Sequence, residues 1–270
     1  MKNPSPSLVI LISALLLAFA ARADAQCTEV LSGLRLPTGS TLSNQGNLLV
    51  AENGTAAAPG SGRISIIDSN GNRRTLIDGM PSGPSDVGDP SGPSGVFMRG
   101  RSLYVAMGTG DTAILGPSRG TAIPNPNGPS SPIFSSILLV QFSATMEQTT
   151  TGVTMTPAHE QALANGETVN LTVNGRDWMT IRRVVDFPNF VAAPLPQFAD
   201  NIAVANPFDL VALGDILYVS DGGRDRVWQV DLLTGGHSTL AAFPPIPNPL
   251  FGGGVGGPVT SAVPTGITAF

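Results

Sequence analysis

The chain has 270 residues, of which 12% are charged, and it contains 32 glycines and 24 prolines. This length allows one large domain, and this composition is typical of a turn-rich all-β protein and excludes one built from long helices. The formal net charge is −5 and no basic stripe occurs, so we expect no nucleic-acid partner. Lys2 is the only lysine in the chain, which excludes Schiff-base chemistry and a Walker-type phosphate lysine in the mature protein.

The first 25 residues have the pattern of a signal peptide. Lys2 precedes an apolar run of 14 residues from Leu8 to Ala21, and Ala23-Asp24-Ala25 offers a small-x-small cleavage site. The run is short for a membrane span, so we expect cleavage and a secreted or periplasmic protein, with an uncleaved anchor as the alternative. Cys27 is the only cysteine and can form no internal disulfide. The mature domain is expected at residues 26–270.

Residues 206–243 give the clearest structural signal. They divide into four short runs rich in β-branched, aromatic and aliphatic residues, each bounded by Gly, Asp or Asn: DLVAL, DILYVS, RVWQVDL and HSTLAAF. This pattern predicts one antiparallel meander of four strands. Such a sheet has two apolar faces and needs neighbouring sheets to cover them.

The opening of this segment recurs along the chain. LPTG, GPSG, NPFD and VPTG begin at Leu36, Gly92, Asn206 and Val263, and their prolines are 56, 114 and 57 residues apart. After each of the first three comes a hydrophobic strand: LLVAE (48–52), LYVA (103–106) and LYVSD (217–221). Such spaced copies predict an all-β fold, a β-propeller of four-stranded antiparallel blades. The three LYV-type strands should then lie in three different sheets.

The spacing predicts about three blades plus one strand. We expect the blades at approximately 34–83, 89–190 and 202–250, and the start of a next blade at 263–270. The second blade is expected to contain a loop at 109–132, a short helix within 157–167 and an outer strand at 180–187. A further degenerate blade within 109–180, with TVNLTV (168–173) as a strand, is the alternative. The single last strand favours a C-terminally truncated chain, whose open blade edges would allow self-association.

The order of these motifs also resembles a known family. LRLPTGSTLSNQGNLLVAENG, GRISIID, GPSGVFMRGRSLYVAMGTG, NPFDLVALGDILYVSDGGRDRVWQVD and VPTGITAF resemble the ScyD/ScyE family of secreted proteins, over roughly 34–108 and 202–270. That family is similar to NHL-repeat and gluconolactonase-like propellers of the six-bladed type. The resemblance implies an exported protein, with a possible link to extracytoplasmic secondary metabolism of the scytonemin kind, and it brings no proven reaction.

The resemblance also suggests the hypothesis of a metal centre. Gluconolactonase-like enzymes hold a divalent cation with Glu, Asn and Asp side chains from the inner ends of different blades, and of the four residues before the repeat prolines only Asn206 can ligate one. Glu52 and Asp221, at equivalent strand ends, are further weak candidates, and Ala106 takes their place in the second blade. Their alternative role is to accept hydrogen bonds from the following Gly-rich turns. We therefore predict no cofactor, with Ca²⁺ or another divalent metal as the alternative.

The remaining polar and aromatic candidates have structural interpretations. Two aspartates are expected to cap turns or to pair with neighbouring arginines: Asp209 and Asp225, with Arg224 and Arg226. The two histidines lie near no recognisable nucleophile motif, and the two tryptophans are expected to pack: His159, His237, Trp178 and Trp228. No catalytic residue is assigned.

The sequence thus favours an exported propeller that acts as a non-catalytic binding or scaffold module for an unknown small molecule or protein. The alternative is an enzyme, either a metal-dependent lactonase-like hydrolase or a quinone-dependent dehydrogenase. Propeller loops at the ends of the blades would carry either function.

Overall fold

The structure of the chain is a computed structural model that describes residue 29 and residues 31–118, 120–149 and 151–269. The expected signal peptide at residues 1–25, and Cys27, lie outside the described residues. The chain divides into two compact units, and the second, Gly33–Phe270, contains every described strand and helix.

Three antiparallel sheets form most of this unit, and the three LYV-type strands lie in three different sheets, as predicted. The first sheet contains β1 (Pro37–Leu42), β2 (Leu48–Glu52), β3 (Gly62–Ile67) and β4 (Arg73–Met80). The second contains β7 (Pro93–Arg99), β8 (Ser102–Met107), β11 (Ser136–Phe142) and β14 (Asp177–Asp186). The third contains β17 (Pro207–Leu213), β18 (Ile216–Asp221), β19 (Arg226–Asp231) and β20 (His237–Ala242).

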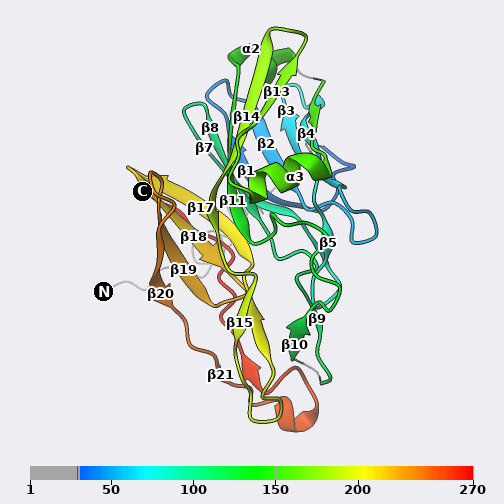
Figure 1. Cartoon of the computed structure of the whole chain (residues 1–270), viewed down its shortest axis with the longest axis vertical. Coiled ribbons are helices and arrows are strands. Elements are labelled where there is room, and N and C mark those ends of the chain that lie inside the picture. Colours follow the sequence, from blue (N-terminus) through cyan, green and yellow to red (C-terminus); the bar gives the residue numbers. More distant parts are fainter. Residues whose placement is uncertain (1–28, 30, 119, 150, 270) are drawn as a thin grey trace, which may run out of the picture. The chain divides into compact units, whose positions relative to one another are not determined.

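The first strands of the three sheets lie side by side. Strand β7 packs against β1 on one side and against β17 on the other. Figure 1 shows the second sheet, in green, between the blue and cyan first sheet and the yellow and orange third sheet. Each sheet therefore leads away from a shared line of first strands, as the blades of a propeller do. The fold is a β-propeller, of which the structure describes three blades.

Small residues after the first two repeat prolines allow this close approach. Thr38 Oγ1 donates a hydrogen bond of 2.8 Å to the carbonyl oxygen of Ser94, and Ser94 Oγ donates one of 2.7 Å to that of Pro207. A Cβ atom at Gly39 would lie 2.6 Å from the same Ser94 oxygen. Glycine is needed there because another backbone occupies the space of a side chain.

Gly95 is the position where this requirement can be tested most directly. We expect Gly95→Ala to lower the free energy of unfolding by about 1–3 kcal/mol, because its Cβ atom would overlap the carbonyl oxygen of Phe208 and lie 2.9 Å from Asp209 Cα. Urea unfolding followed by circular dichroism measures the change. Gly266→Ala, at the corresponding position of the last repeat, is the matched control, because nothing lies within 4 Å of its Cβ position. Equal stabilities of the two variants would contradict the close contact of the first strands.

Two hydrophobic cores fill the spaces between neighbouring blades. The first lies between the first and second sheets and includes Leu49, Ile64, Leu76, Leu103, Val105, Leu138 and Val140, each at most 3% exposed. The second lies between the second and third sheets and includes Tyr104, Ile137, Val185, Phe187, Leu210, Val219 and Trp228. The blades thus cover each other's apolar faces, as the spacing of the repeats predicted.

The insertions of the second blade extend existing sheets and form no further blade in the described residues. Strand β13 (Val169–Val173), which contains most of the TVNLTV segment, pairs with β14 as a fifth strand. Strand β12 (Val153–Thr154) pairs in parallel with β4 of the first blade. The predicted helix is confirmed as α3 (Pro157–Ala164) and is preceded by α2 (Ala144–Thr149). The alternative of a degenerate blade was therefore wrong, because β14 offered a free edge to the apolar residues of β13.

Short hairpins form in the predicted loop at 109–132 and at three other places outside the main sheets. The segment 109–132 contains β9 (Ala113–Leu115) and β10 (Ala122–Pro124), which pair with each other. Further pairs are formed by β5 (Gly83–Pro84) with β6 (Pro90–Ser91), β15 (Phe190–Ala192) with β16 (Ile202–Val204), and β21 (Ile246–Pro247) with β22 (Val259–Thr260). A 3₁₀ turn, η1 (Phe251–Gly253), lies between the last two strands. The third blade thus spans 207–242, narrower than the predicted 202–250, because β16 pairs with β15 and not with β17.

The predicted strand at 263–270 is not formed in the described residues 261–269. The segment nevertheless begins as the first repeat does: Leu36 and Val263, each before a repeat proline, have left-handed φ values of 54° and 45°. Ile267 N donates a hydrogen bond of 3.1 Å to Asp209 Oδ2 of β17. In each of the three blades the first strand pairs with the second strand of the same sheet. Among the described residues, no second strand lies beside 263–269, so this segment has no strand to pair with.

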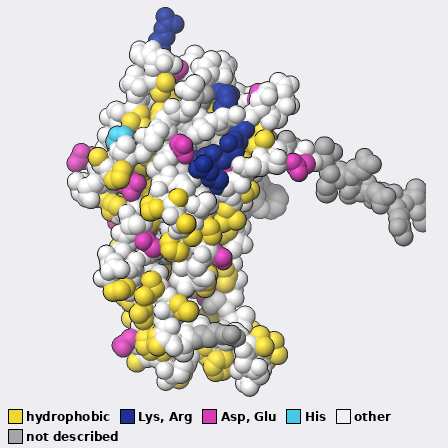
Figure 2. Space-filling model, turned by 90° about the vertical axis from the view of Figure 1, so that its right-hand side faces the viewer, with side chains coloured by type: hydrophobic (Ala, Val, Ile, Leu, Met, Phe, Trp, Pro, Cys, Tyr) yellow, Lys and Arg dark blue, Asp and Glu magenta, His cyan; other side chains and the backbone are white. Residues whose placement is uncertain are grey.

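The segments outside the blades expose apolar side chains. Figure 2 shows hydrophobic side chains over the lower half of the face that it presents. The exposed large apolar residues of these segments are Phe190, Val191, Ile246, Leu250, Phe251 and Val255. Among the described residues, no helix is long and apolar enough to cross a membrane.

Candidate functional site

A cavity of about 990 Å³ lies over the beginnings of the three first strands. Leu36, Ser94 and Asn206, which begin or precede the first strands, lie in its wall. Its volume is at the upper end of the range of pockets that bind small molecules in proteins. We call this cavity the axial pocket.

Two hairpins form an apolar wall of the axial pocket. Ala113 and Ala122 of the β9–β10 hairpin pack against Ile202 and Val204 of β16, and Ala122 N donates to Asn201 Oδ1 at 2.9 Å. The apolar side chains that line the pocket from these and neighbouring segments are Leu115, Ala122, Ala193, Leu195, Ile202, Val204, Phe243, Val259 and Val263. Two segments that lie more than 60 residues apart in the sequence thus build one surface.

Polar side chains line the end of the pocket nearest the first strands. Asn206 Oδ1 accepts a hydrogen bond of 3.1 Å from Thr109 N, and Asn53 Oδ1 accepts one of 3.2 Å from Gly92 N. Ser91 Oγ accepts one of 3.0 Å from Gly110 N. Within the described residues, neither Asn53 Nδ2 nor Asn206 Nδ2 donates a hydrogen bond to the protein. Both amide groups therefore keep donors for a bound molecule.

Arg224 lines the pocket from the turn between β18 and β19 and is only 6% exposed. Gly223 brings this turn against the backbone of Val204, where a Cβ atom would overlap the Val204 carbonyl oxygen. The Arg224 Nη2 group donates to the carbonyl oxygen of Pro188, and the buried Nε has no hydrogen-bond partner among the described residues. Burial lowers the pKa of Arg224, and the attraction of Asp221 opposes that shift.

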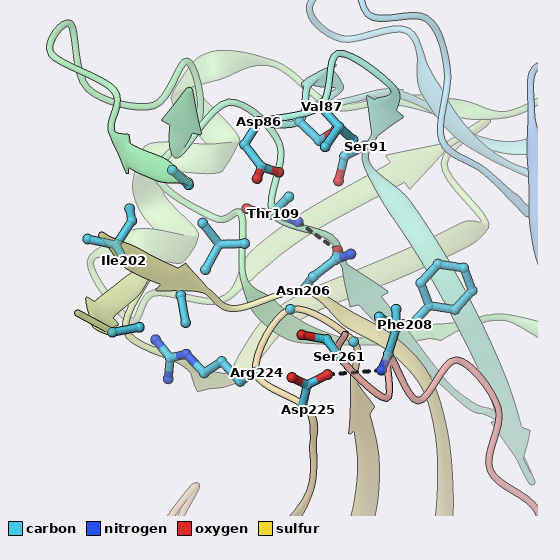
Figure 3. Close-up of a pocket in the computed structure, with 18 of the residues that line it drawn as sticks. Asp86, Val87, Ser91, Thr109, Ile202, Asn206, Phe208, Arg224, Asp225 and Ser261 are labelled. Carbon is cyan, nitrogen blue, oxygen red and sulfur yellow. Dashed lines mark hydrogen bonds between the residues drawn. The ribbon is translucent and has the colours of Figure 1, made fainter. Parts of the chain in front are cut away.

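The turn between β5 and β6 supplies a second group of polar atoms. Ser85 Oγ is buried and has no hydrogen-bond partner in the part of the chain that the structure describes. Burial raises the pKa of Asp86, although the backbone N–H groups of Asp86 and Val87 hydrogen-bond its carboxylate. In the view of Figure 3, Asp86 and Arg224 lie on opposite sides of the pocket, with Thr109 and Asn206 between them.

Of the three predicted metal candidates, only Asn206 lines the axial pocket. Its backbone confirms the predicted equivalence of the residues before the repeat prolines. The carbonyl oxygens of Leu36, Gly92 and Asn206 each accept a hydrogen bond from the backbone N–H of the residue directly after the second strand of their blade. The side-chain oxygen of Asn206 is already used by Thr109 N.

Glu52 is fully buried and accepts three hydrogen bonds. Arg63 Nη2 and Arg35 N donate to Oε2 at 2.8 and 2.5 Å, and Ser65 Oγ donates to Oε1 at 2.5 Å. Burial opposes ionisation, but these hydrogen bonds and the charge of Arg63 outweigh it and lower the pKa of Glu52. None of the three donors belongs to the Gly-rich turn after Glu52, so the predicted turn interaction is wrong here.

Asp221 is also fully buried, and here the predicted turn interaction is confirmed. Its Oδ1 accepts hydrogen bonds from Gly223 N and Arg224 N, both at 3.1 Å, and from Asn206 N at 2.8 Å. Trp228 Nε1 donates to Oδ2 at 2.8 Å. Burial raises the pKa of Asp221, since these hydrogen bonds and Arg224 offset it only in part.

The register corrects the predicted counterpart in the second blade. Pro37 pairs with Glu52 and Pro207 with Asp221, whereas Pro93 pairs with Met107 and not with Ala106. The second blade therefore has a thioether where the other two have carboxylates. In the part of the chain that the structure describes, no three His, Cys, Asp or Glu side chains gather in a way that could hold a metal ion.

Most of the other residues singled out in the sequence form hydrogen bonds or packing contacts that stabilise the fold. Asp209 Oδ1 accepts from Leu210 N, and Asp225 Oδ1 accepts from Val263 N at 2.9 Å, so neither pairs with the neighbouring arginines. His159 closes the capping box of α3. Trp228 stacks on Phe187 with ring centroids 5.2 Å apart, as predicted for a packing residue, whereas Trp178 is 42% exposed.

Sequence reasoning missed Arg224 as a pocket residue. It was predicted to pair with a neighbouring aspartate, and its burial depends on Pro188 and Val204, which are distant in the sequence. The one local signal is the pair Gly222-Gly223, because consecutive glycines permit a close approach to another backbone.

No protein-family model and no curated protein matches the chain. Among solved structures, it is similar to a putative oxidoreductase (glucose dehydrogenase) of Thermus thermophilus, with 14% identity, 80% of this chain and 87% of that chain covered, and a TM-score of 0.26. It is also similar to a gluconolactonase of Xanthomonas campestris, with 15% identity, 80% and 65% covered, and a TM-score of 0.29. The PQQ-bound aldose sugar dehydrogenase of Streptomyces coelicolor has 14% identity, 79% and 83% covered, and a TM-score of 0.23. The assignment of the propeller fold therefore rests on the sheets of this chain.

Proposed function

We propose that this protein is an exported, non-catalytic binding module, and that the axial pocket is the site of a small-molecule ligand. The expectation of export comes from the leader-like pattern of residues 1–25. The pocket supports the proposal of a small-molecule ligand, because its wall is largely apolar and a few polar groups face it from different segments.

One observation carries this proposal. Among the described residues, four buried side-chain nitrogen and oxygen atoms lack a hydrogen-bond partner, and two of them, Ser85 Oγ and Arg224 Nε, belong to residues of the axial pocket. An unpaired buried polar atom costs about 1–3 kcal/mol, so such atoms normally have water or a ligand as partner. Their concentration at one cavity favours a bound polar group there.

The contacts of the predicted metal candidates favour a binding role over the metal-dependent alternative. A cation at Glu52 or Asp221 would have to replace the three or four hydrogen bonds that each carboxylate already accepts. It would also have to enter a fully buried position, since both residues are 0% exposed. Hard cations require several converging oxygens to offset their dehydration.

The test uses N-phenyl-1-naphthylamine, an uncharged dye that fluoresces in apolar sites. We expect saturable binding of the dye to the wild-type chain. Ala193→Trp should weaken it about tenfold, because Ala193 lines the pocket and an indole would fill part of it. Fluorescence titration measures both affinities.

Ala57→Trp is the matched control, because Ala57 is exposed and does not line the pocket. It should bind the dye as the wild type does. Equal binding by all three chains, or no saturable binding by any, would contradict the axial pocket as a ligand site. A melting temperature that rises by several degrees with Ca²⁺ or Zn²⁺ would instead support the metal-dependent alternative.

A further inference from the structure

The buried guanidinium of Arg224 makes one end of the axial pocket chemically distinct. In the described residues, Arg224 forms no ion pair with a carboxylate. Its only side-chain hydrogen bond there is to the carbonyl oxygen of Pro188, so the Nη1 group donates to no protein acceptor. Asp221 attracts this charge, and the guanidinium carbon lies 6.0 Å from the Trp228 ring centroid, but neither group accepts a hydrogen bond from the guanidinium. A cation that keeps free donors at a cavity fits an anionic group.

Four other charged side chains line the pocket, of which Asp89 is exposed. Arg226 has its guanidinium carbon 4.8 Å from the Trp228 ring centroid and donates to Thr239 Oγ1 and to the carbonyl oxygen of Arg224. Asp225 accepts a hydrogen bond from Val263 N. Asp86 lies on the opposite side from Arg224 in Figure 3, and burial raises its pKa.

The surroundings of Arg224 determine what the rest of the ligand must be. The turn that carries Arg224 contacts β16 through Gly223 and Val204, so the guanidinium lies at the end of the apolar hairpin wall. Ile202 and Val204 of that wall also line the pocket. A ligand whose anionic group reached Arg224 would place its remaining atoms against aliphatic side chains, where an apolar body gains from burial.

We propose that the axial pocket binds a small organic acid, with its carboxylate on Arg224 and its apolar body against the β9–β10 and β15–β16 hairpins. This inference rests on the proposed function and adds the chemical class of the ligand. Planar guanidinium groups bind carboxylates through two parallel hydrogen bonds, for which the free donors of Arg224 are suited. The free donors at Asn53 and Asn206, of which Asn206 lies between Asp86 and Arg224 in Figure 3, can bind a neutral polar group of the same molecule.

The experiment measures displacement of N-phenyl-1-naphthylamine from the wild-type chain by two ligands of the same shape. We expect 1-naphthylacetate to displace the dye at a concentration about tenfold lower than 1-naphthylacetamide, because only the acid carries a charge. Arg224→Met should abolish this preference, which is measured as the ratio of the two displacing concentrations in the same variant. Arg182→Met, which removes an exposed arginine of β14 outside the pocket, should keep the preference.

The outcomes separate the two proposals. Equal displacement by the acid and the amide from wild-type chain that binds the dye would overturn the organic-acid inference and leave the axial pocket as a ligand site. A preference for the acid that persists in folded Arg224→Met would also overturn it. Absence of dye binding to the wild type would contradict the proposed function itself. The wild-type comparison needs no substitution, so it decides the inference even where Arg224→Met fails to fold.

Discussion

Glu52→Ala is expected to lower the free energy of unfolding by about 3–5 kcal/mol, which is the usual cost of removing one partner of a buried ion pair. The variant leaves the guanidinium of Arg63, which is 6% exposed, without its carboxylate at 2.8 Å. Ser65 Oγ, which is fully buried, also loses its acceptor. Urea unfolding followed by circular dichroism measures the loss, and Arg63→Ala completes a double-mutant cycle.

Glu167→Ala is the control, because that carboxylate is exposed and makes no ion pair in the described residues. The effect of Glu52→Ala should depend on pH in one direction. Since the pKa of Glu52 is lowered, its contribution is complete above the unfolded value of 4.5 and is lost as the pH falls through the folded value. A destabilisation that stays constant into acidic solution would show that Glu52 is not held as a carboxylate.

Asp221→Ala is expected to lower the free energy of unfolding by about 3 kcal/mol or more, because several buried donors lose one acceptor together. These donors are the backbone N–H groups of Asn206, Gly223 and Arg224 and the indole of Trp228. Because Asn206 and Arg224 line the axial pocket, the same variant should also weaken binding of the dye. Asp215→Ala, an exposed aspartate of the same blade, is the control for both measurements.

The pH dependence of Asp221 should have the opposite sign. Burial raises its pKa above the unfolded value of 3.8, so the folded protein binds this proton more tightly than the unfolded chain. The contribution of Asp221 is then complete below 3.8 and is lost as the pH rises through the folded value. Asp221→Ala should therefore destabilise the protein more at acidic than at neutral pH, which urea unfolding at both conditions can test.

Two carboxylates at equivalent strand ends thus behave differently because their cross-strand neighbours differ in conformation. Glu52 pairs in register with Arg63, and Asp221 pairs with Arg226. Arg63 donates to the carboxylate opposite it, whereas Arg226 turns to the ring of Trp228 and to Thr239. The sequence shows the repeat but not which side chain each arginine will meet.

The repeats predicted the blades because their signal is local. Each strand alternates or concentrates apolar residues, and its ends have turn residues, as in the Asp68 turn, where Asp68 Oδ1 accepts from Asn70 N and Asn72 N. The short strands β9, β12, β15 and β16 carry no such signal, since two or three residues have no measurable period. Their pairing depends on segments distant in the sequence, and the pocket wall that they build was therefore not predictable.

The candidate site was predictable only where it coincides with a repeat. Asn206 was found because it precedes a repeat proline, and it does line the axial pocket. Arg224 and Ser85 are candidates because each has a buried polar atom without a hydrogen-bond partner among the described residues. No property of the sequence specifies which polar atoms will be buried and unpaired. The ScyD/ScyE resemblance, the export and the identity of the ligand stay predictions.

The parallel pairing of β12 with β4 has a consequence for association between copies. Val153 and Thr154 belong to an insertion of the second blade, but they pair with the edge strand of the first sheet and so connect the two blades. Another chain could pair with the backbone of Ile77 and Asp78 only after β12 had separated from β4. Strand β20 ends the third sheet with no other described strand beside it, and its residues His237–Leu240 are exposed. We therefore expect another copy of the chain to pair with the third blade by strand addition.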